Sequence, residues 1–224
     1  MVKFEQVTKK FGQITALENV SSEIKKGEFV FITGPSGSGK TTLLRLLLRE
    51  ISPNKGKILI EGKDISTLRS SEIPFYRRKI GVVFQDFKLL ADRTVYENVE
   101  LVMEVSGEGQ SAKRKINDAL KQVGLAERAN LFPRQLAGGE QQRTVLARAL
   151  VAQPKLILAD EPTGNLDPAT ARQIVSLIDQ AAKNGTTVLM ATHNADIVNS
   201  LKRRVIQLKQ GKVVSDKASG KYQE

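Results

Sequence analysis

The stretch Gly34-Pro-Ser-Gly-Ser-Gly-Lys-Thr41 decides the fold, because it fills every fixed position of the pattern G-x-x-x-x-G-K-T. An apolar run, Phe29-Val-Phe-Ile32, comes before it, and the helical pattern Thr42-Leu-Leu-Arg-Leu-Leu-Leu-Arg49 follows it. A strand, a glycine-rich turn and a helix in this order form the context in which the pattern binds phosphate groups. The sequence therefore predicts a nucleotide site at this turn.

The chemistry of this loop explains its residue types. Glycines allow successive backbone N–H groups to turn inward around the phosphates, and the following helix adds its positive N-terminal end. We expect Lys40 to neutralise the terminal phosphates and the Thr41 hydroxyl to complete a Mg²⁺ shell. The predicted nucleotide contacts are Gly34, Pro35, Ser36, Gly37, Ser38, Gly39, Lys40, Thr41 and Thr42.

Short apolar runs alternate with helical patterns along the chain, which is typical of an α/β fold. Two nearly all-apolar runs, at 156–159 and 187–191, predict central parallel strands buried on both faces. Further strands are predicted at 57–60 and 80–84, with a terminal hairpin over 205–214.

The middle of the chain differs, because helical patterns follow one another there without strands. Between Ser111 and Val123, apolar residues fall on one helix face while the basic residues lie outside it. We therefore expect one domain over 1–224, in which residues 1–86 and 153–224 form the α/β core and residues 87–152 form an inserted helical subdomain.

Polar side chains end three of the predicted strands. Asp160 and Glu161 follow the run 156–159, and neighbouring strand residues point in different directions, so the two carboxylates take different roles. We expect Asp160 to hold Mg²⁺ through water and Glu161 to act as the base that polarises the attacking water. His193, the one histidine, would approach the γ-phosphate, and Gln85 would offer its amide to Mg²⁺ or to the water.

A second glycine pair lies in Leu136-Ala-Gly-Gly-Glu-Gln-Gln-Arg143, ahead of a helix predicted at Thr144–Ala152. Free N–H groups at a helix N-terminus form another anion site. One nucleotide does not need two such sites from one chain. The second loop is therefore predicted to serve the nucleotide held by a second subunit.

With this motif the chain resembles the ATP-binding-cassette ATPases over essentially its whole length. The shared elements occur in the family's order: the glycine loop, Gln85, L-x-G-G-E-Q, Asp160-Glu161, Asn165-Leu-Asp167 and His193. The resemblance implies a P-loop NTPase core of the RecA type with an inserted helical subdomain and an N-terminal antiparallel β region. It also implies ATP and Mg²⁺ as ligands, and a head-to-tail homodimer that forms with ATP.

The resemblance further assigns roles to single residues. Phe11 stands where an aromatic ring stacks on adenine, Gln85 couples the nucleotide state to the partner, and Asp167 lies in the loop that crosses the dimer interface. ATP contacts from the opposite subunit would come from Leu136, Ala137, Gly138, Gly139, Glu140, Gln141 and Asp167. The family usually has serine where this chain has Ala137, so we expect weaker dimer closure or slower turnover, but not inactivity.

Within that family, the segments 84–99 and 160–167 resemble the FtsE cell-division ATPases. That resemblance implies a cytoplasmic ATPase bound to the membrane protein FtsX, which controls cell-wall hydrolysis. The lipoprotein-release and macrolide-export ATPases share Thr-Gly-Asn-Leu-Asp and remain the alternative, as does any other importer or exporter ATPase. Phe87, Leu89 and Leu90 predict a docking surface for the partner, unless they pack inside the helical subdomain.

Composition limits where the protein acts and which partners it binds. No apolar run reaches the ~18 residues of a membrane span, and the acidic start does not resemble a signal peptide, so we expect a soluble chain that stays where it is made. The family resemblance implies that it acts as a peripheral protein at the cytoplasmic face of the membrane. No cysteine is present, which excludes disulfides and thiol chemistry. The net charge of +11 is concentrated toward the C-terminus and suits anionic lipid, nucleic acid or simply solvent. We expect no nucleic-acid partner, because cassette proteins that act on ribosomes or DNA commonly carry two cassettes or a long insertion. A nucleotide-binding switch that barely hydrolyses ATP is a further alternative, and Glu161 and His193 argue against it.

Overall fold

The computed structural model describes residues 1–107 and 112–222, which form two compact units. The first unit combines Met1–Arg77 with the C-terminal part from Thr187 onward, and the second comprises Arg78–Thr186. Each unit is described on its own. The helical stretch predicted at 87–152 lies inside the second unit, which also contains the strands and the helix that flank it.

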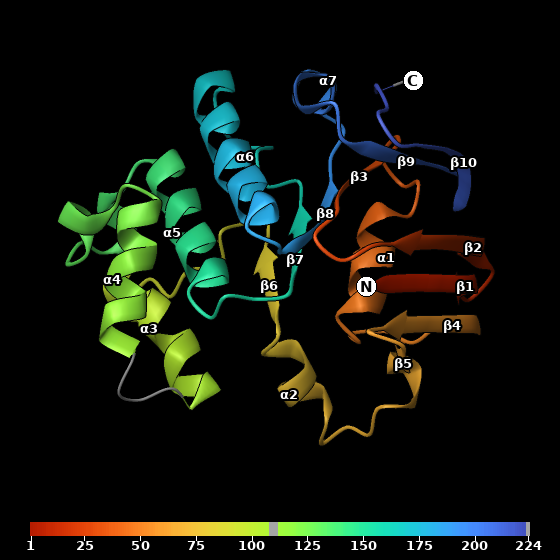
Figure 1. The fold of residues 1–224 in the computed structure, drawn as a ribbon, viewed down its shortest axis with the longest axis horizontal. Helices are drawn as coiled ribbons and strands as arrows, with labels where there is room; N and C mark the ends of the chain where they lie inside the picture. Colours follow the sequence, from red (N-terminus) through yellow and green to blue (C-terminus); the bar gives the residue numbers. More distant parts are fainter. Residues whose placement is uncertain (108–111, 223–224) are drawn as a thin grey trace. The chain divides into compact units, whose positions relative to one another are not determined.

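The first unit contains an antiparallel sheet and a group of mainly parallel strands (Figure 1). The antiparallel sheet has the order β2-β1-β4-β5, with the bounds β1 Val2–Phe11, β2 Ile14–Ile24, β4 Lys55–Ile60 and β5 Lys63–Asp64. The other strands follow the order β10-β9-β3-β8, with the bounds β3 Phe29–Thr33, β8 Thr187–Ala191, β9 Arg204–Lys209 and β10 Lys212–Lys217. The helices are α1 Lys40–Leu47, η1 Ile65–Thr67, α2 Ile73–Arg77 and α7 Ala195–Leu201.

The strands β3 and β8 form the core of this unit, and every residue in both is buried. They run parallel, with Phe29 opposite Val188 and Ile32 opposite Ala191. Strand β9 joins the other side of β3, also in parallel, and turns back into β10. The predicted buried strands and terminal hairpin are therefore confirmed, and the antiparallel sheet implied by the family resemblance is present.

Helix α1 is anchored at its C-terminal end by α2. The Tyr76 hydroxyl donates to the Leu47 carbonyl, and the Arg77 guanidinium donates to the carbonyls of Leu48 and Arg49 at 2.8 and 3.1 Å. The last carbonyls of a helix lack partners within that helix, and these donors satisfy them. The segment around residue 75 thus holds in place the helix that begins at the phosphate loop.

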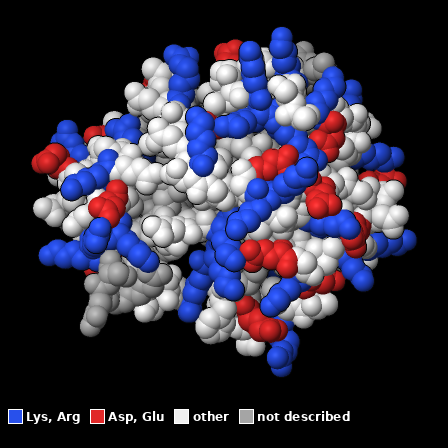
Figure 2. All heavy atoms as spheres, in the orientation of Figure 1, with Lys and Arg blue, Asp and Glu red and all other residues white. Residues whose placement is uncertain are grey.

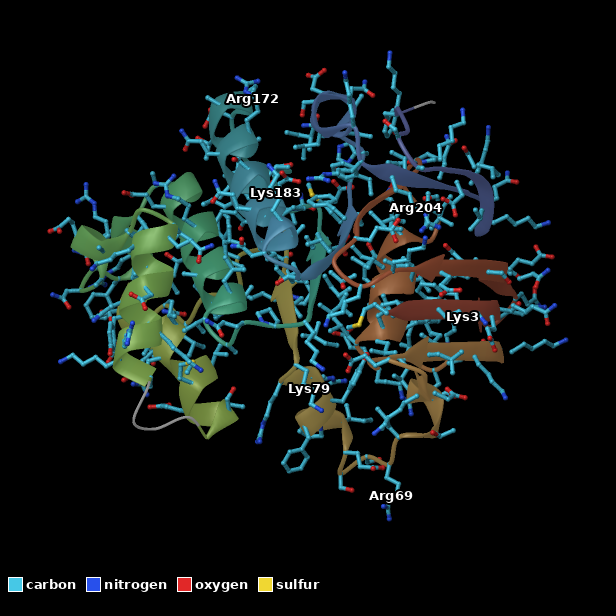
Figure 3. The ribbon with its side chains drawn as sticks, in the orientation of Figure 1. Lys3, Arg69, Lys79, Arg172, Lys183 and Arg204 are labelled. Atoms are coloured by element: carbon cyan, nitrogen blue, oxygen red, sulfur yellow. The ribbon has the colours of Figure 1, made fainter. Side chains whose placement is uncertain are left out.

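Arg204 ties several strands of the first unit together (Figure 3). Its guanidinium bonds both carboxylate oxygens of Asp216 at 2.7 Å and bonds Glu28 at 3.0 Å. These two acids hold the pKa of Arg204 above its usual value, although partial burial opposes the shift. The C-terminal segment beyond β10 is also held, because the Gly220 N–H bonds the Arg203 carbonyl and the Tyr222 N–H bonds the Asn199 side chain.

The second unit contains two parallel strands and a group of helices. Its elements are β6 Ile80–Val83, α3 Val95–Ser106, α4 Ala112–Gln122, η2 Ala126–Arg128, η3 Pro133–Gln135, α5 Gly138–Leu150, β7 Leu156–Asp160 and α6 Pro168–Lys183. Helix α5 is central, because it contacts α3, α4, α6 and β6. The predicted helix from Ser111 is observed as α4 from Ala112, and Ser111 itself lies outside the described residues.

The helix predicted at Thr144–Ala152 was placed wrongly, because α5 begins at Gly138 and ends at Leu150. Ala137 has an extended backbone, and the Glu140 carboxylate accepts the Ala137 N–H at 2.9 Å. This hydrogen bond gives an acceptor to the Ala137 N–H, which has none within the helix. It thereby allows the helix to begin at the glycine pair.

Two further observations concern the surface. None of the helices in the described ranges is both long and apolar enough to span a membrane. Lysine and arginine side chains are spread over much of the visible face, with acidic side chains between them (Figure 2). The positive net charge of +11 is therefore not confined to the C-terminal segment.

Candidate active site

The glycine loop of the first unit has a backbone that requires its glycines. Gly34 has a φ of 141°, and a Cβ at this position would lie 2.1 Å from the Leu208 carbonyl oxygen. Gly39, the residue before α1, has a φ of 106°, and its Cβ would lie 2.6 Å from the Ala16 carbonyl oxygen. Both positions thus combine a left-handed conformation with no room for a side chain. The loop is built between neighbouring segments rather than hanging free.

The interior of this loop fits the phosphates of a nucleotide. The Lys40 ammonium donates to the carbonyls of Gly34 and Pro35 at 2.8 and 3.1 Å, and the residue is only 8% exposed. The Ser38 hydroxyl oxygen is buried and has no hydrogen-bond partner among the described residues. A buried cation and an unsatisfied hydroxyl beside a helix N-terminus are complementary to an anion.

The same edge of this unit carries His193. Because β3 and β8 are parallel neighbours, the glycine loop after β3 and the residues after β8 leave the strands at the same end. The Thr192 N–H bonds the Ile32 carbonyl at 3.1 Å, which fixes the start of the second loop. His193 is exposed at this end. The strand pairing therefore brings the one histidine and the phosphate loop to one edge, as predicted.

Phe11 lies at the end of β1 in the same unit. Its ring is 43% exposed, and the Lys9 ammonium lies 5.0 Å from the ring centroid. An accessible aromatic face of this kind suits stacking on a nucleotide base. Its role toward adenine stays a prediction.

The second unit brings together Gln85, Asp160 and Glu161. Strands β6 and β7 are parallel neighbours, with Val83 opposite Ala159, so the residues that follow both strands lie at one edge. Glu161 has a φ of 47°, a left-handed conformation that is uncommon for a residue with a side chain. The turn is closed by a bond from the Gly164 N–H to the Glu161 carbonyl at 3.1 Å.

Gln85 also contacts the loop that follows Glu161. Its amide nitrogen lies 3.4 Å from the Asn165 side-chain oxygen, and the Asn165 amide nitrogen lies 3.5 Å from the Gln85 carbonyl oxygen. A Cβ on Gly164 would lie 2.9 Å from the Gln85 amide nitrogen, so glycine is what allows the amide to lie there. The motif Thr-Gly-Asn-Leu-Asp therefore has a local reason for both its glycine and its asparagine.

The second glycine pair forms the first turn of α5, where backbone N–H groups have no partner within the helix. Gly139 packs so closely on α6 that a Cβ would lie 2.5 Å from the Thr170 methyl group. The preceding loop is held by Gln141, whose amide donates to the carbonyls of Pro133 and Leu136 at 3.1 and 3.2 Å. Leu136 is itself buried. Leu136 and Gln141 thus shape the loop through contacts within their own chain.

Two acidic residues predicted to act across a dimer also have partners within the unit. Glu140 binds the Ala137 N–H and lies 3.5 Å from the Arg128 guanidinium. The Asp167 carboxylate caps α6 by accepting the N–H groups of Ala169 and Thr170, both at 3.0 Å. Hydrogen bonds from Thr170 lower the pKa of Asp167 below its usual value, because they favour the charged carboxylate. Asp167 therefore fixes the start of α6 in addition to any role across an interface.

Replacing Ala137 by serine is expected to strengthen the first turn of α5. Ala137 occupies the N-cap position but provides no side-chain cap, and serine at that position commonly stabilises a helix by about 1 kcal/mol. A serine hydroxyl would also add a donor near the free N–H groups. We expect Ala137→Ser to raise the melting temperature and the steady-state ATPase rate of the complex with its membrane partner. Unchanged values for both would contradict this account of Ala137.

The predicted site residues thus fall into two groups, one in each unit. The first unit holds the phosphate loop, Phe11 and His193, and the second holds Gln85, the acidic pair, the glycine-pair loop and Asp167. Sequence reasoning named Gly164 and Asn165 only as parts of a motif, without a role, and did not consider Thr170; all three support this chemistry by close packing. A strand-flanked phosphate loop, an acidic pair after a buried strand and a helix that starts at Gly-Gly define the class of ATP-binding cassettes.

Comparison with known proteins agrees with this class. The family model described as ABC transporter matches residues 17–164. The cell division ATP-binding protein FtsE of Bacillus subtilis is 48% identical over 99% of this chain and 98% of its own length. FtsE of Escherichia coli strain K12 is 46% identical, with 94% of this chain and 96% of the relative covered.

A solved structure provides a further comparison. The dimeric post-hydrolysis structure of the ATP-binding cassette MJ0796, bound to ADP and Pi, has a TM-score of 0.88 and 39% identity, covering 99% of this chain and 100% of that one. The chain belongs to the ABC transporter family of ATPases and, within it, to the proteins named FtsE. Its enzymatic activity is therefore ATP hydrolysis, and its fold is that of an ABC nucleotide-binding domain.

Proposed function

We propose that this chain is the ATPase subunit of an FtsEX-type complex, in which ATP binding and hydrolysis drive a membrane partner that controls cell-wall hydrolysis during division. The relatives named FtsE support the proposal because they match over nearly full length at 46–48% identity. The chain would be a peripheral protein at the cytoplasmic face of the membrane and would reach the membrane through FtsX, with no nucleic acid involved. A lipoprotein-release, macrolide-export or other ABC transporter subunit is the alternative.

The chemistry that we propose divides the site residues by role. Lys40 and the loop N–H groups bind the phosphates, and Glu161 polarises the attacking water with His193 near the γ-phosphate. Mg²⁺, held by Thr41 and Gln85 directly and by Asp160 through water, would neutralise charge on the phosphates. In a head-to-tail homodimer, the opposite chain would add the first turn of its α5. The structure of the cassette MJ0796, which is dimeric with ADP and Pi bound, supports the formation of a dimer.

The observation that best supports a membrane partner is the rigid mounting of segment 86–94. The side chain of Asn98 is fully buried; it accepts the Leu90 N–H at 2.8 Å and donates to the carbonyls of Leu90, Arg93 and Thr94 at 2.9 to 3.1 Å. Arg148, which is half-buried, donates to the carbonyls of Phe87 and Lys88 at 3.1 and 2.7 Å. A loop held at so many backbone groups is preorganised for binding.

This mounted segment presents apolar side chains beside α3. Phe87 and Leu89 are half-buried, whereas Leu90 is 41% exposed, and Leu101 and Val105 on α3 are 38% and 50% exposed. The predicted docking residues thus pack partly into the helical part and partly face outward. We propose that an amphipathic helix of the membrane partner covers this apolar surface.

Substitution of Phe87 and Leu90 by alanine is expected to reduce co-purification of the membrane partner at least tenfold, because the partner loses its apolar contacts. Binding of ATP should stay within twofold of wild type. Leu90→Asp tests the same surface with less risk to folding, and Val214→Asp places the same charge at another exposed apolar residue, which lies in β10. Capture of FtsX by Val214→Asp but not by Leu90→Asp supports the proposal. Capture of a solute permease in place of FtsX overturns the assignment to FtsEX.

A further inference from the structure

Gln142 joins three functional segments of the second unit through buried hydrogen bonds. The residue lies in α5 and is 1% exposed. Its amide nitrogen donates to the Pro162 carbonyl at 2.6 Å and lies 3.4 Å from the Phe84 carbonyl. Pro162 follows Glu161 directly, and Phe84 precedes Gln85 directly. One side chain of α5 therefore holds the backbone beside the predicted base and the backbone beside the predicted Mg²⁺ ligand.

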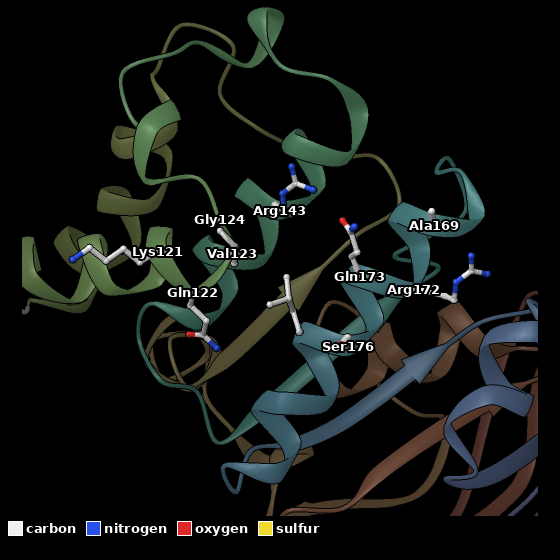
Figure 4. Close-up of a pocket in the computed structure, with 10 residues that line it drawn as sticks. Lys121, Gln122, Val123, Gly124, Arg143, Ala169, Arg172, Gln173 and Ser176 are labelled. Carbon is white, nitrogen blue, oxygen red and sulfur yellow. The ribbon is translucent and has the colours of Figure 1, made fainter.

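The neighbours of Gln142 on α5 do not share this position. Arg143 faces an open groove between α4, α5 and α6, where Gln173 and Arg172 also lie (Figure 4). Thr144 is fully buried, but its hydroxyl bonds only the Glu140 carbonyl one turn earlier in the same helix. Gln142 therefore differs from Arg143 and Thr144 in its contacts with the Pro162 and Phe84 carbonyls.

The start of α5 connects Gln142 to the glycine pair. Gly138 and Gly139 begin the helix, and Gln142 lies about one turn further along. Gly139 lies so close to α6 that a Cβ would not fit beside the Thr170 methyl group. Because a helix moves largely as one element, a displacement of this first turn would reach Gln142 and the two carbonyls that it contacts.

We propose that Gln142 is a positioning residue that couples the two ATP sites of the dimer. The inference rests on the proposed head-to-tail dimer, in which the start of α5 binds the ATP of the opposite subunit, whereas Gln85 and Glu161 serve the ATP of their own subunit. Engagement of one ATP by the glycine pair is thereby transmitted through Gln142 to the base at the other ATP. Gln142 itself touches neither nucleotide.

The test compares Gln142→Met with wild type in the complex with its membrane partner. Methionine keeps the length and volume of the side chain but removes the amide that bonds both carbonyls. In wild type we expect a Hill coefficient for ATP hydrolysis of about 2, the upper limit for a dimer with two ATP sites. In Gln142→Met we expect a Hill coefficient of about 1 and a several-fold lower kcat. Binding of a fluorescent ATP analogue to the Lys40 loop should stay within twofold.

Thr144→Val is the matched control, because it removes a buried hydroxyl from the same helix without touching the two carbonyls. It should keep the wild-type Hill coefficient. Gln142→Asn keeps the amide but shortens its reach, and it replaces Gln142→Met if the latter does not fold. A Hill coefficient unchanged in the Gln142 variant, equally reduced in Thr144→Val, or close to 1 in wild type overturns the proposed coupling. Absence of an ATP-dependent dimer would instead refute the proposed assembly.

Discussion

Replacing Glu161 by glutamine is expected to lower the rate of ATP hydrolysis by roughly 10²- to 10⁴-fold, the range that a positioned general base contributes. Glutamine has the same shape but cannot accept a proton from the attacking water. Glutamine and glutamate have the same backbone preferences, so residue 161 should keep its φ of 47° and the turn should keep its conformation. ATP binding should therefore survive while phosphate release, measured in the complex with its membrane partner, nearly ceases.

Glu127→Gln is the control for loss of a carboxylate. Glu127 is an exposed residue of the same unit and lies in η2, an element separate from β6 and β7. Its substitution should leave the rate within twofold of wild type. A loss of less than tenfold in Glu161→Gln would show that another group polarises the water, and the role assigned to Glu161 would be wrong.

The second large effect is expected at Lys40. Lys40→Met keeps the buried aliphatic stem but removes the ammonium that bonds the carbonyls of Gly34 and Pro35. A hydrogen bond to a charged group contributes about 1.5–3 kcal/mol, so affinity for ATP should fall roughly 10- to 150-fold. Equilibrium binding of a fluorescent ATP analogue measures this loss directly.

The control for Lys40 is a lysine outside the loop. Lys26 is exposed in the same unit, and Lys26→Met changes the net charge by the same amount. It should bind ATP like wild type, with a melting temperature close to that of Lys40→Met. Equal loss of affinity in both variants would indicate a general effect of charge, and unaltered affinity in Lys40→Met would remove Lys40 from the binding site.

The sequence predicted well those parts of the fold in which every residue has the same environment or in which local geometry requires one residue type. The residues of β3 and β8 are all buried, and a short, wholly apolar run has few other places in an α/β protein. The phosphate loop was predictable because its glycines are required by local geometry, as the contacts of Gly34 and Gly39 show. In such places the local pattern and the tertiary structure agree.

Other elements could not be predicted from local patterns. Strands β1 and β2 pair with register shifts, so their buried residues do not alternate regularly. Antiparallel structure in this region was expected only from the family resemblance. Helix α2 is short and has no buried residues, so it carries no apolar periodicity. Helix α5 starts earlier than expected because Glu140 bonds back to Ala137, a contact that outweighs the low helix propensity of glycine.

The residues of the candidate site also divide into those that local sequence patterns predict and those that depend on tertiary contacts. Gln85, Asp160, Glu161 and His193 were predictable because each follows an apolar strand at the edge where ligands bind. The roles of Gln142 and Asn165 were not predictable, because they depend on backbone carbonyls and amides that approach from distant segments. In sequence Gln142 resembles any polar residue near the start of a helix. Its burial is what reveals its role.

The central claim is that two copies of this chain hold each ATP jointly, one by the Lys40 loop and the other by the first turn of α5. The most direct measurement is the molecular mass of the Glu161→Gln protein with Mg-ATP, alone and with its membrane partner, by analytical ultracentrifugation. We predict two facing copies in the complex with ATP and their loss when Lys40→Met is added. Complexes that contain a single copy at saturating Mg-ATP would contradict the claim.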